Sequence, residues 1–299
     1  MRVLVLGAGG QLGKLVVQHA PSHAKVSSYA SAVCDITDLH SLRSVISKTG
    51  ADLVINCAAY TKVDLAESAA EQAWAVNQLG IENLVKATRA DTRLLHVSTD
   101  FVFDGSATQP YATTAATAPL GVYGASKLAG ETILLQQAPQ RSTIVRTAWL
   151  YAAAGQNFMN TMLRLLQTRT ELKVVHDQRG TPTAAHGLAK ALWAFADKPE
   201  VHGIYHWTDA GEASWYEFAC EIQQQALARG LLQQQIPVLP IATSDYPTPA
   251  RRPAYSVLDK SSTWAALGLQ AQPWQAMLGE VLDQLKRINT ATLQDKEAP

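Results

Sequence analysis

The chain has 299 residues, enough for one large domain or two smaller ones with a sizeable buried core. Its 25 Lys and Arg balance 25 Asp and Glu, and the absence of a basic tract argues against a nucleic-acid partner. No apolar run reaches the roughly 18 residues of a membrane span, and strand-like sequence from Arg2 leaves no room for a signal peptide. The three scattered cysteines fit neither a zinc site nor a disulfide framework. We therefore expect a cytoplasmic protein with no membrane partner.

The first half alternates short apolar runs with amphipathic stretches. We predict strands at Arg2–Leu6, Lys25–Ser28, Asp52–Asn56, Arg93–Ser98 and Ser142–Thr147. We predict helices at Gln11–His19, around Leu39–Ile46 behind a cap at Thr37 or Asp38, from about Ala66 to Arg89, and at Tyr123–Gln137. Strands that alternate with helices indicate an α/β fold: a Rossmann-type, doubly wound parallel sheet covered on both faces.

The regular alternation of predicted strands and helices becomes less clear after about residue 150. Helices are predicted at 157–167, 184–196 and 274–287, a strand at 203–207, a capping box at Ser214–Glu217, and proline-rich loops at 237–240 and 246–253. We therefore predict a dinucleotide-binding domain at 1–155 and a smaller C-terminal α/β substrate-binding lobe formed mainly by 156–299. Residues around 180–206 are candidates to return to the first domain.

A glycine-rich turn, Gly7-Ala-Gly-Gly10-Gln-Leu-Gly13, follows the first strand and opens the first helix. Glycines at this spacing allow a tight turn and close approach of backbone to a diphosphate, which the N–H groups of the helix start, Gln11 and Leu12 included, would bind. Lys25-Val-Ser-Ser-Tyr29 carries neither the acid typical of NAD binding nor the Arg typical of NADP binding, so NADPH or NADH stays open. Asp35 and Ile36 would contact the adenine, or simply form the loop that leads into a helix.

Three further segments end strands at the edge where an open parallel sheet binds ligands. One contains Ala58, Ala59, Tyr60 and Thr61, whose small alanines let a cofactor approach the backbone. The second contains Ser98, Thr99 and Asp100, with hydroxyls suited to a carbonyl oxygen, and the third runs from Arg146 to Trp149. Asn77, an amide within a helical pattern, is placed to support the site from behind.

Tyr123 and Lys127 are four residues apart, on one face of a predicted helix. A nearby ammonium favours phenolate, so Lys127 is expected to lower the pKa of Tyr123 from its usual value of about 10. Such a pair indicates acid–base chemistry at a carbonyl or alcohol.

Together these motifs resemble the extended short-chain dehydrogenase/reductases, and most closely the dTDP-4-dehydrorhamnose reductase family. The likeness rests on the glycine turn, Asn77-Gln-Leu-Gly80, Ser98-Thr-Asp-Phe-Val-Phe-Asp-Gly105, Tyr123-Gly-Ala-Ser-Lys127, Arg146-Thr-Ala-Trp149, Asp177-Gln-Arg-Gly-Thr-Pro-Thr183 and Tyr246-Pro-Thr-Pro-Ala-Arg-Arg-Pro253. It implies reduction of a dTDP-4-keto sugar to dTDP-L-rhamnose for bacterial cell-surface polysaccharide, with Tyr123, Lys127 and Thr99 as catalytic residues. It implies substrate contacts from Thr99, Asp100 and Trp149; Arg251 or Arg252 would pair with the substrate diphosphate, or form a solvated loop face.

The sequence departs from this family at several places. Phe101 stands where Tyr is common, Tyr255 where Asn is common, and Lys14-Leu15 where some members carry an acid that binds magnesium at a dimer contact. We assign no metal ligand, and magnesium dependence and a homodimer stay open. Two other functions also stay open: a non-catalytic, cofactor-binding regulatory subunit, and an epimerase or dehydratase acting on another nucleotide sugar.

Overall fold

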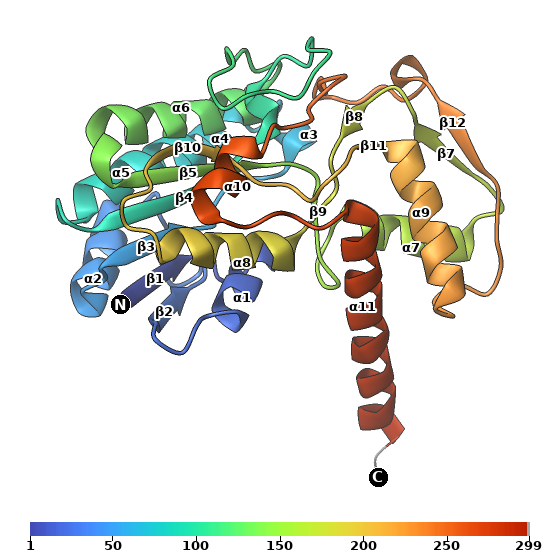
Figure 1. Cartoon of the computed structure of the whole chain (residues 1–299), viewed down its shortest axis with the longest axis horizontal. Helices are drawn as coiled ribbons and strands as arrows, with labels where there is room; N and C mark the ends of the chain where they lie inside the picture. Colours follow the sequence, from blue (N-terminus) through green and yellow to red (C-terminus); the bar gives the residue numbers. More distant parts are fainter. Residues whose placement is uncertain (298–299) are drawn as a thin grey trace.

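A parallel sheet forms the centre of the computed structural model, which describes residues 1–297, with side chains as far as residue 290 (Figure 1). Its six strands lie in the order β2 (Lys25–Tyr29), β1 (Arg2–Leu6), β3 (Leu53–Asn56), β4 (Arg93–Thr99), β5 (Ser142–Thr147) and β10 (Gly203–His206). Every neighbouring pair is parallel. The chain adds β2 on one side of β1 and then crosses to add β3, β4, β5 and β10 on the other side. In open sheets with such a change of direction, ligands bind beyond the carboxyl ends of the strands next to it. The predicted Rossmann-type fold is confirmed.

The two faces of the sheet are covered by different helices because successive side chains of a strand point to opposite faces. Val3 and Val5 of β1 join the core beneath α1 (Gln11–Gln18) and α8 (Ala185–Ala196). Leu4 and Leu6 join the core on the other face, with side chains of α2 (Leu39–Thr49), α5 (Gly80–Ala87) and α6 (Val122–Gln137). The near-continuous apolar runs of the strands therefore reflect burial on both faces.

The helical region predicted from about Ala66 to Arg89 consists of several short elements. The structure has α3 (Val63–Ala66), α4 (Ala70–Trp74), a π-helical turn η1 (Ala75–Leu79), and then α5. The turn holds Asn77, whose Oδ1 accepts a hydrogen bond from Tyr60 N at 2.9 Å and whose Nδ2 donates to Tyr60 O at 3.1 Å and Ser126 Oγ at 3.0 Å. A π-turn changes the direction of side chains within a helix, and here it orients Asn77 to form these three hydrogen bonds.

A second core lies in the C-terminal part of the chain, on the right of Figure 1. It is enclosed by α7 (Phe158–Thr168), α9 (Trp215–Ala228), α11 (Trp274–Glu297) and the parallel pair β7 (Leu172–Val175) and β12 (Val238–Ile241). The loop predicted at 237–240 is wrong, because β12 occupies most of it; Pro240 is tolerated there since β12 pairs on one side only. The last helix also runs ten residues beyond its predicted end. Although both come late in the chain, α8 packs on the first sheet and β10 is the edge strand of that sheet. The domain boundary near residue 155 stays a prediction.

The remaining elements are short. They are β6 (Leu150–Tyr151), β8 (Arg179–Gly180), β9 (Thr183–Ala184), β11 (Ala213–Ser214), α10 (Ser261–Leu267), η2 (Asp100–Val102), η3 (Pro139–Arg141) and η4 (Thr243–Asp245). The predicted capping box opens α9: Glu217 N donates to Ser214 Oγ at 3.1 Å, and Ser214 N donates to Glu217 Oε2 at 2.6 Å. Within residues 1–297, no helix is long and apolar enough to cross a membrane.

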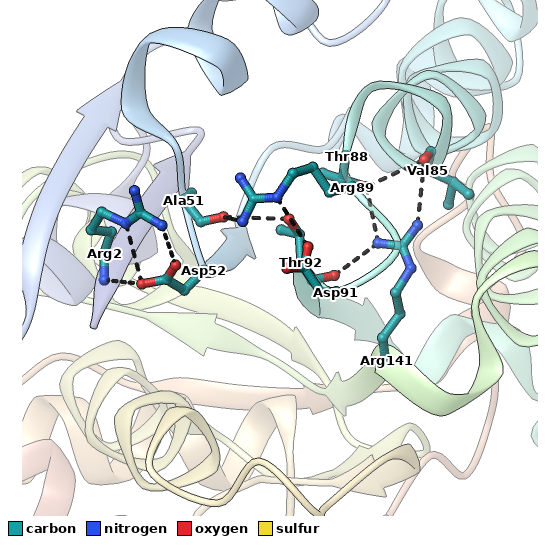
Figure 2. A network of polar contacts seen from close by, with 9 residues as sticks. All are labelled: Arg2, Ala51, Asp52, Val85, Thr88, Arg89, Asp91, Thr92 and Arg141. Carbon is teal, nitrogen blue, oxygen red and sulfur yellow. Dashed lines mark hydrogen bonds and ion pairs between the residues drawn. The ribbon is translucent and has the colours of Figure 1, made fainter.

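A polar network ties together the segments at the amino-terminal edge of the sheet (Figure 2). Arg2, which begins β1, pairs with Asp52 just before β3, with Nη2 and Oδ1 2.6 Å apart. Arg141 donates to Thr88 Oγ1 at 2.9 Å and to Thr92 O at 2.8 Å. These contacts link strand starts to helix ends, whereas the predicted site residues lie at the carboxyl edge.

Candidate active site

A cavity of about 430 Å³ opens at the carboxyl ends of the central strands. Predicted site residues that line it are Gly10, Gln11, Leu12, Gly13, Ala59, Thr61, Thr99, Asp100, Tyr123, Lys127 and Trp149. They come from α1, α6 and the segments after β3, β4 and β5, so the topology brings together residues up to 139 positions apart. A larger hollow of about 810 Å³, between α9 and residues 235–238, shares no residue with this cavity.

The glycine turn has the geometry that a diphosphate site requires. Gly7 has a φ of +75°, and a Cβ there would lie 2.5 Å from Ala58 N. A Cβ on Gly13 would lie 2.3 Å from Gly7 O, so this glycine lets α1 start directly against the turn. Gly10 caps α1 without a side-chain hydrogen bond, which leaves the first N–H groups of the helix facing the cavity. This turn fits the diphosphate of a dinucleotide.

The other predicted cofactor residues are divided between the cavity and its supports. Ala58 N donates to Asn56 Oδ1 at 3.1 Å, and both backbone groups of Tyr60 are bonded to Asn77. Asp35 accepts hydrogen bonds from N and Oγ1 of Thr37 at 2.9 and 2.8 Å, while Ile36 is buried in the core. Neither Asp35 nor Ile36 lines the cavity, so their contact with adenine stays a prediction.

Tyr123 lines the cavity next to Thr99. Burial raises the pKa of Tyr123 to about 12; a hydrogen bond with Thr99 opposes this shift, and the Asp100 carboxylate adds to it. The ring of Phe101 meets the Tyr123 ring edge-on, with centroids 5.5 Å apart. The expected lowering of this pKa by Lys127 is therefore wrong for the structure, because desolvation of the phenolate dominates. Tyr123 is a protonated phenol at neutral pH.

Lys127 is buried, and its Nζ has two polar neighbours. Its Nζ donates to Val97 O at 2.7 Å and lies 3.1 Å from His96 Nε2. Burial lowers the pKa of Lys127 to about 8, although Glu131 and Cys57 oppose the shift. His96 belongs to no predicted site motif; its one signal in the sequence is a titratable residue between the apolar Leu95 and Val97 of a strand.

Asp100 and Trp149 also line the cavity. Asp100 Oδ1 accepts from Thr99 Oγ1 at 3.1 Å, and hydrogen bonds with Ser256 and Thr99 favour the carboxylate. Burial raises the pKa of Asp100 to about 6. Trp149 has a φ of +47°, unusual for a bulky residue, and stacks on Trp215 of α9 with ring centroids 3.4 Å apart.

The two predicted diphosphate-binding arginines lie outside this cavity. Arg252 forms an ion pair with Asp64, with Nη2 and Oδ2 2.7 Å apart, and it also donates to Thr248 Oγ1 at 2.6 Å. Arg251 is exposed, and both arginines line a neighbouring hollow of about 560 Å³. Arg252 is therefore held in an ion pair within the protein, whereas Arg251 remains exposed beside the 560 Å³ hollow.

A buried ion pair supports the floor of the site. Arg146 of β5 and Glu131 of α6 are joined by two close contacts, Nη2–Oε2 at 2.6 Å and Nε–Oε1 at 2.9 Å. Ser98 Oγ also donates to Glu131 Oε1 at 2.5 Å. The pair fixes α6, and with it Tyr123 and Lys127, against the sheet. The described residues hold no group of three or more His, Cys, Asp or Glu placed to bind a metal ion.

Known proteins share both the sequence and the fold. The model of the RmlD substrate binding domain family matches residues 1–287. The dTDP-4-dehydrorhamnose reductase of Aggregatibacter actinomycetemcomitans is 41% identical over 290 residues, which cover 94% of this chain and 98% of that protein. The crystal structure of dTDP-4-dehydrorhamnose reductase from Bacillus anthracis in complex with NADP matches with a TM-score of 0.89 and 33% identity, covering 95% of this chain and 99% of that one. The corresponding structure from Clostridium acetobutylicum also has a TM-score of 0.89, at 36% identity and with 96% and 100% coverage.

Proposed function

The chain belongs to the RmlD substrate binding domain family, and on that premise we propose that it reduces the 4-keto group of dTDP-4-dehydro-β-L-rhamnose to give dTDP-L-rhamnose, with NADPH or NADH as reductant. The matches extend over nearly the whole chain, second lobe included. The observation that carries the proposal is a single cavity containing a diphosphate-type glycine turn at one end and Thr99, Tyr123 and Lys127 at the other.

The cofactor would lie along the wall formed by the turn and by Ala59 and Thr61. The chemistry that a reduced nicotinamide supplies when bound is a hydride for C4 of the sugar. The amine of Lys127, the one basic side chain lining the cavity among the described residues, would hold the nicotinamide ribose by a hydrogen bond.

Tyr123 would donate the proton that the reduction requires. As C4 is reduced, negative charge develops on O4, and an alkoxide is the conjugate base of a much weaker acid than a phenol. Even with its pKa raised to about 12, Tyr123 therefore gives its proton to O4 downhill. A protonated phenol at neutral pH suits the reductive direction, in which Tyr123 donates the proton.

Thr99 would position O4 for that transfer. Its hydroxyl lies between Tyr123 and Asp100, and its one hydrogen, which Asp100 Oδ1 accepts in the structure, would turn to O4 where the charge appears. Asp100 and Trp149 would contact the sugar, and Arg251 would meet the substrate diphosphate from the neighbouring hollow. Arg252 is assigned a supporting role, because Asp64 already holds it.

The test is a spectrophotometric assay of purified protein with the dTDP keto sugar and each reduced cofactor. One cofactor should be oxidised for each sugar reduced. Tight cofactor binding without oxidation would indicate a regulatory subunit, and turnover without net oxidation would indicate an epimerase or dehydratase. Three free cysteines support a cytoplasmic location, and dTDP-rhamnose would supply cell-surface polysaccharide.

A further inference from the structure

Three buried side chains from different elements form a line behind the candidate active site. Asn56 ends β3, His96 lies within β4, and Lys127 is on α6; each is 2% exposed or less. Asn56 Nδ2 lies 3.0 Å from His96 Nδ1, and His96 Nε2 lies 3.1 Å from Lys127 Nζ. The histidine therefore uses both ring nitrogens, one toward an amide and the other toward the lysine.

The orientation of the Asn56 amide is fixed by the backbone. Ala58 N–H donates a hydrogen bond to Asn56 Oδ1 at 3.1 Å. Of the two ends of the Asn56 amide group, only the oxygen can accept this bond. The amide nitrogen must then face His96. Because an amide NH₂ only donates, His96 Nδ1 has to accept this hydrogen bond.

That bond determines the tautomer of His96, since a neutral imidazole carries one proton. With Nδ1 as acceptor, the proton is on Nε2, which then donates toward Lys127 Nζ. Only a neutral amine has a lone pair to accept it. A Lys127 ammonium would require Nε2 to accept and Nδ1 to carry the proton, and two donors would then face each other between His96 and Asn56. Such a contact between buried groups is unfavourable.

We propose that Asn56 and His96 are positioning residues that favour the neutral form of the Lys127 amine by holding His96 in the Nε2–H tautomer. Lys127 then keeps one hydrogen for Val97 O, 2.7 Å away, and one for the cavity. Its proton count can change as charge appears on Tyr123 during turnover. This inference deepens the proposed function, and its test is independent of activity.

The other charged or titratable groups around Lys127 do not produce this effect. Glu131, on the same helix, favours the ammonium, but its carboxylate is held by Arg146 and Ser98. Cys57, after β3, stays a thiol at neutral pH because burial raises its pKa to about 12. Burial lowers the pKa of His96 well below its usual range, so this ring is neutral, as the tautomer argument requires.

NMR on the full-length protein tests the proposal directly. Nitrogen-15 shifts of labelled histidine, with His96 identified from His96→Gln, report the tautomer. Carbon-13 shifts of labelled lysine, with Lys127 identified from Lys127→Ala, report its titration. At pH 9 we expect the Nε2–H tautomer, with Lys127 titrating at least one unit below the usual value of about 10.4. An Nδ1–H tautomer of His96, or a Lys127 that titrates at its usual value, would overturn the proposal, and the wild-type protein is sufficient for this measurement.

Asn56→Asp inverts the polarity of the line with little change in shape. One carboxylate oxygen still accepts from Ala58 N–H, while the other accepts from His96 Nδ1–H, so Nε2 becomes an acceptor for a Lys127 ammonium. We expect a change to the Nδ1–H tautomer, a rise in the Lys127 titration of at least about one unit, and the same shift in the alkaline limb of kcat. A raised titration with the Nε2–H tautomer retained would show a purely electrostatic effect of the new charge and overturn the proposal.

Gln223→Glu is a matched control. Gln223 is also a buried amide whose oxygen accepts from a backbone N–H, that of Ile236 at 2.9 Å, and whose nitrogen donates to a carbonyl, that of Ile236 at 3.0 Å. It lies on α9, outside the active-site cavity. This variant should leave both the His96 tautomer and the Lys127 titration unchanged; a shift equal to that of Asn56→Asp would contradict a local effect.

A wild-type protein that shows the expected tautomer but no activity would refute the reductase assignment and leave the present proposal intact.

Discussion

Replacing Gly13 with alanine tests whether the glycine turn is built for close approach of α1. The added Cβ would lie 2.3 Å from Gly7 O and 2.8 Å from Ala8 Cα, whereas ordinary contact begins at 3.4 Å, so the start of α1 must move by about 1.1 Å. Overpacking of this kind costs about 1–3 kcal/mol, and the higher helix propensity of alanine offsets about 1 kcal/mol of it. We expect a net loss of up to about 2 kcal/mol of stability, or a few degrees in Tm.

The same displacement should weaken cofactor binding. N–H donors that move by this distance leave hydrogen-bonding range, and losing one bond to a charged group costs about 1.5–3 kcal/mol. The Kd for NADPH or NADH, measured by fluorescence titration, should therefore rise about ten- to hundredfold. A variant that binds with wild-type affinity and melts at the wild-type temperature would refute the reasoning.

Gly10→Ala separates the two effects within the same turn. Its Cβ would lie 3.4 Å from Gly7 O, an ordinary contact, yet it would project where Gly10 lines the cavity. We expect weakened cofactor binding with an unchanged Tm. If Gly10→Ala were the less stable of the two variants, the assignment of Gly13 to packing and Gly10 to ligand approach would be wrong.

Three further outcomes are expected. Tyr123→Phe should lower kcat by about 10²–10⁴-fold while cofactor binding, followed by titration, is kept; full activity would remove Tyr123 from its role. Thr99→Val removes one donor and should lower kcat less than Tyr123→Phe does, which the same steady-state assay decides. Burial raises the pKa of Asp209 to about 8, above its usual 3.8, so the native state keeps a proton that the unfolded chain loses and stability falls as pH rises from about 4 to 8. Asp209→Asn should flatten that dependence in urea unfolding at pH 5, 7 and 9, and an unchanged slope would assign it to other groups.

Much of the fold follows from local sequence pattern. The first strand was predicted with its observed bounds, and the apolar runs and glycine turn correctly indicated a parallel, doubly wound sheet. The segments predicted to end strands at the site do converge on one cavity, because the carboxyl ends of parallel strands share an edge.

What the sequence could not supply is set by long-range contacts. The partner of Arg252 is Asp64, far away in sequence, and no local pattern indicates that pairing. The raised pKa of Tyr123 depends on burial within the assembled cavity, so spacing to Lys127 alone gave the wrong direction. His96 was overlooked for the same reason, since its two partners lie on other elements.

The π-helical turn η1 makes the chain sensitive to length at one place. Such a turn is an α-helix with one residue inserted. Deleting a single residue from Ala75–Leu79 would restore continuous α-helix and leave the flanking segments in nearly their present orientation, because the π-turn already absorbs the extra residue. Asn77 would then lose its bonds to Tyr60 and Ser126, and the loop beside the cavity would lose its anchor. A homologue one residue shorter here must hold that loop in some other way.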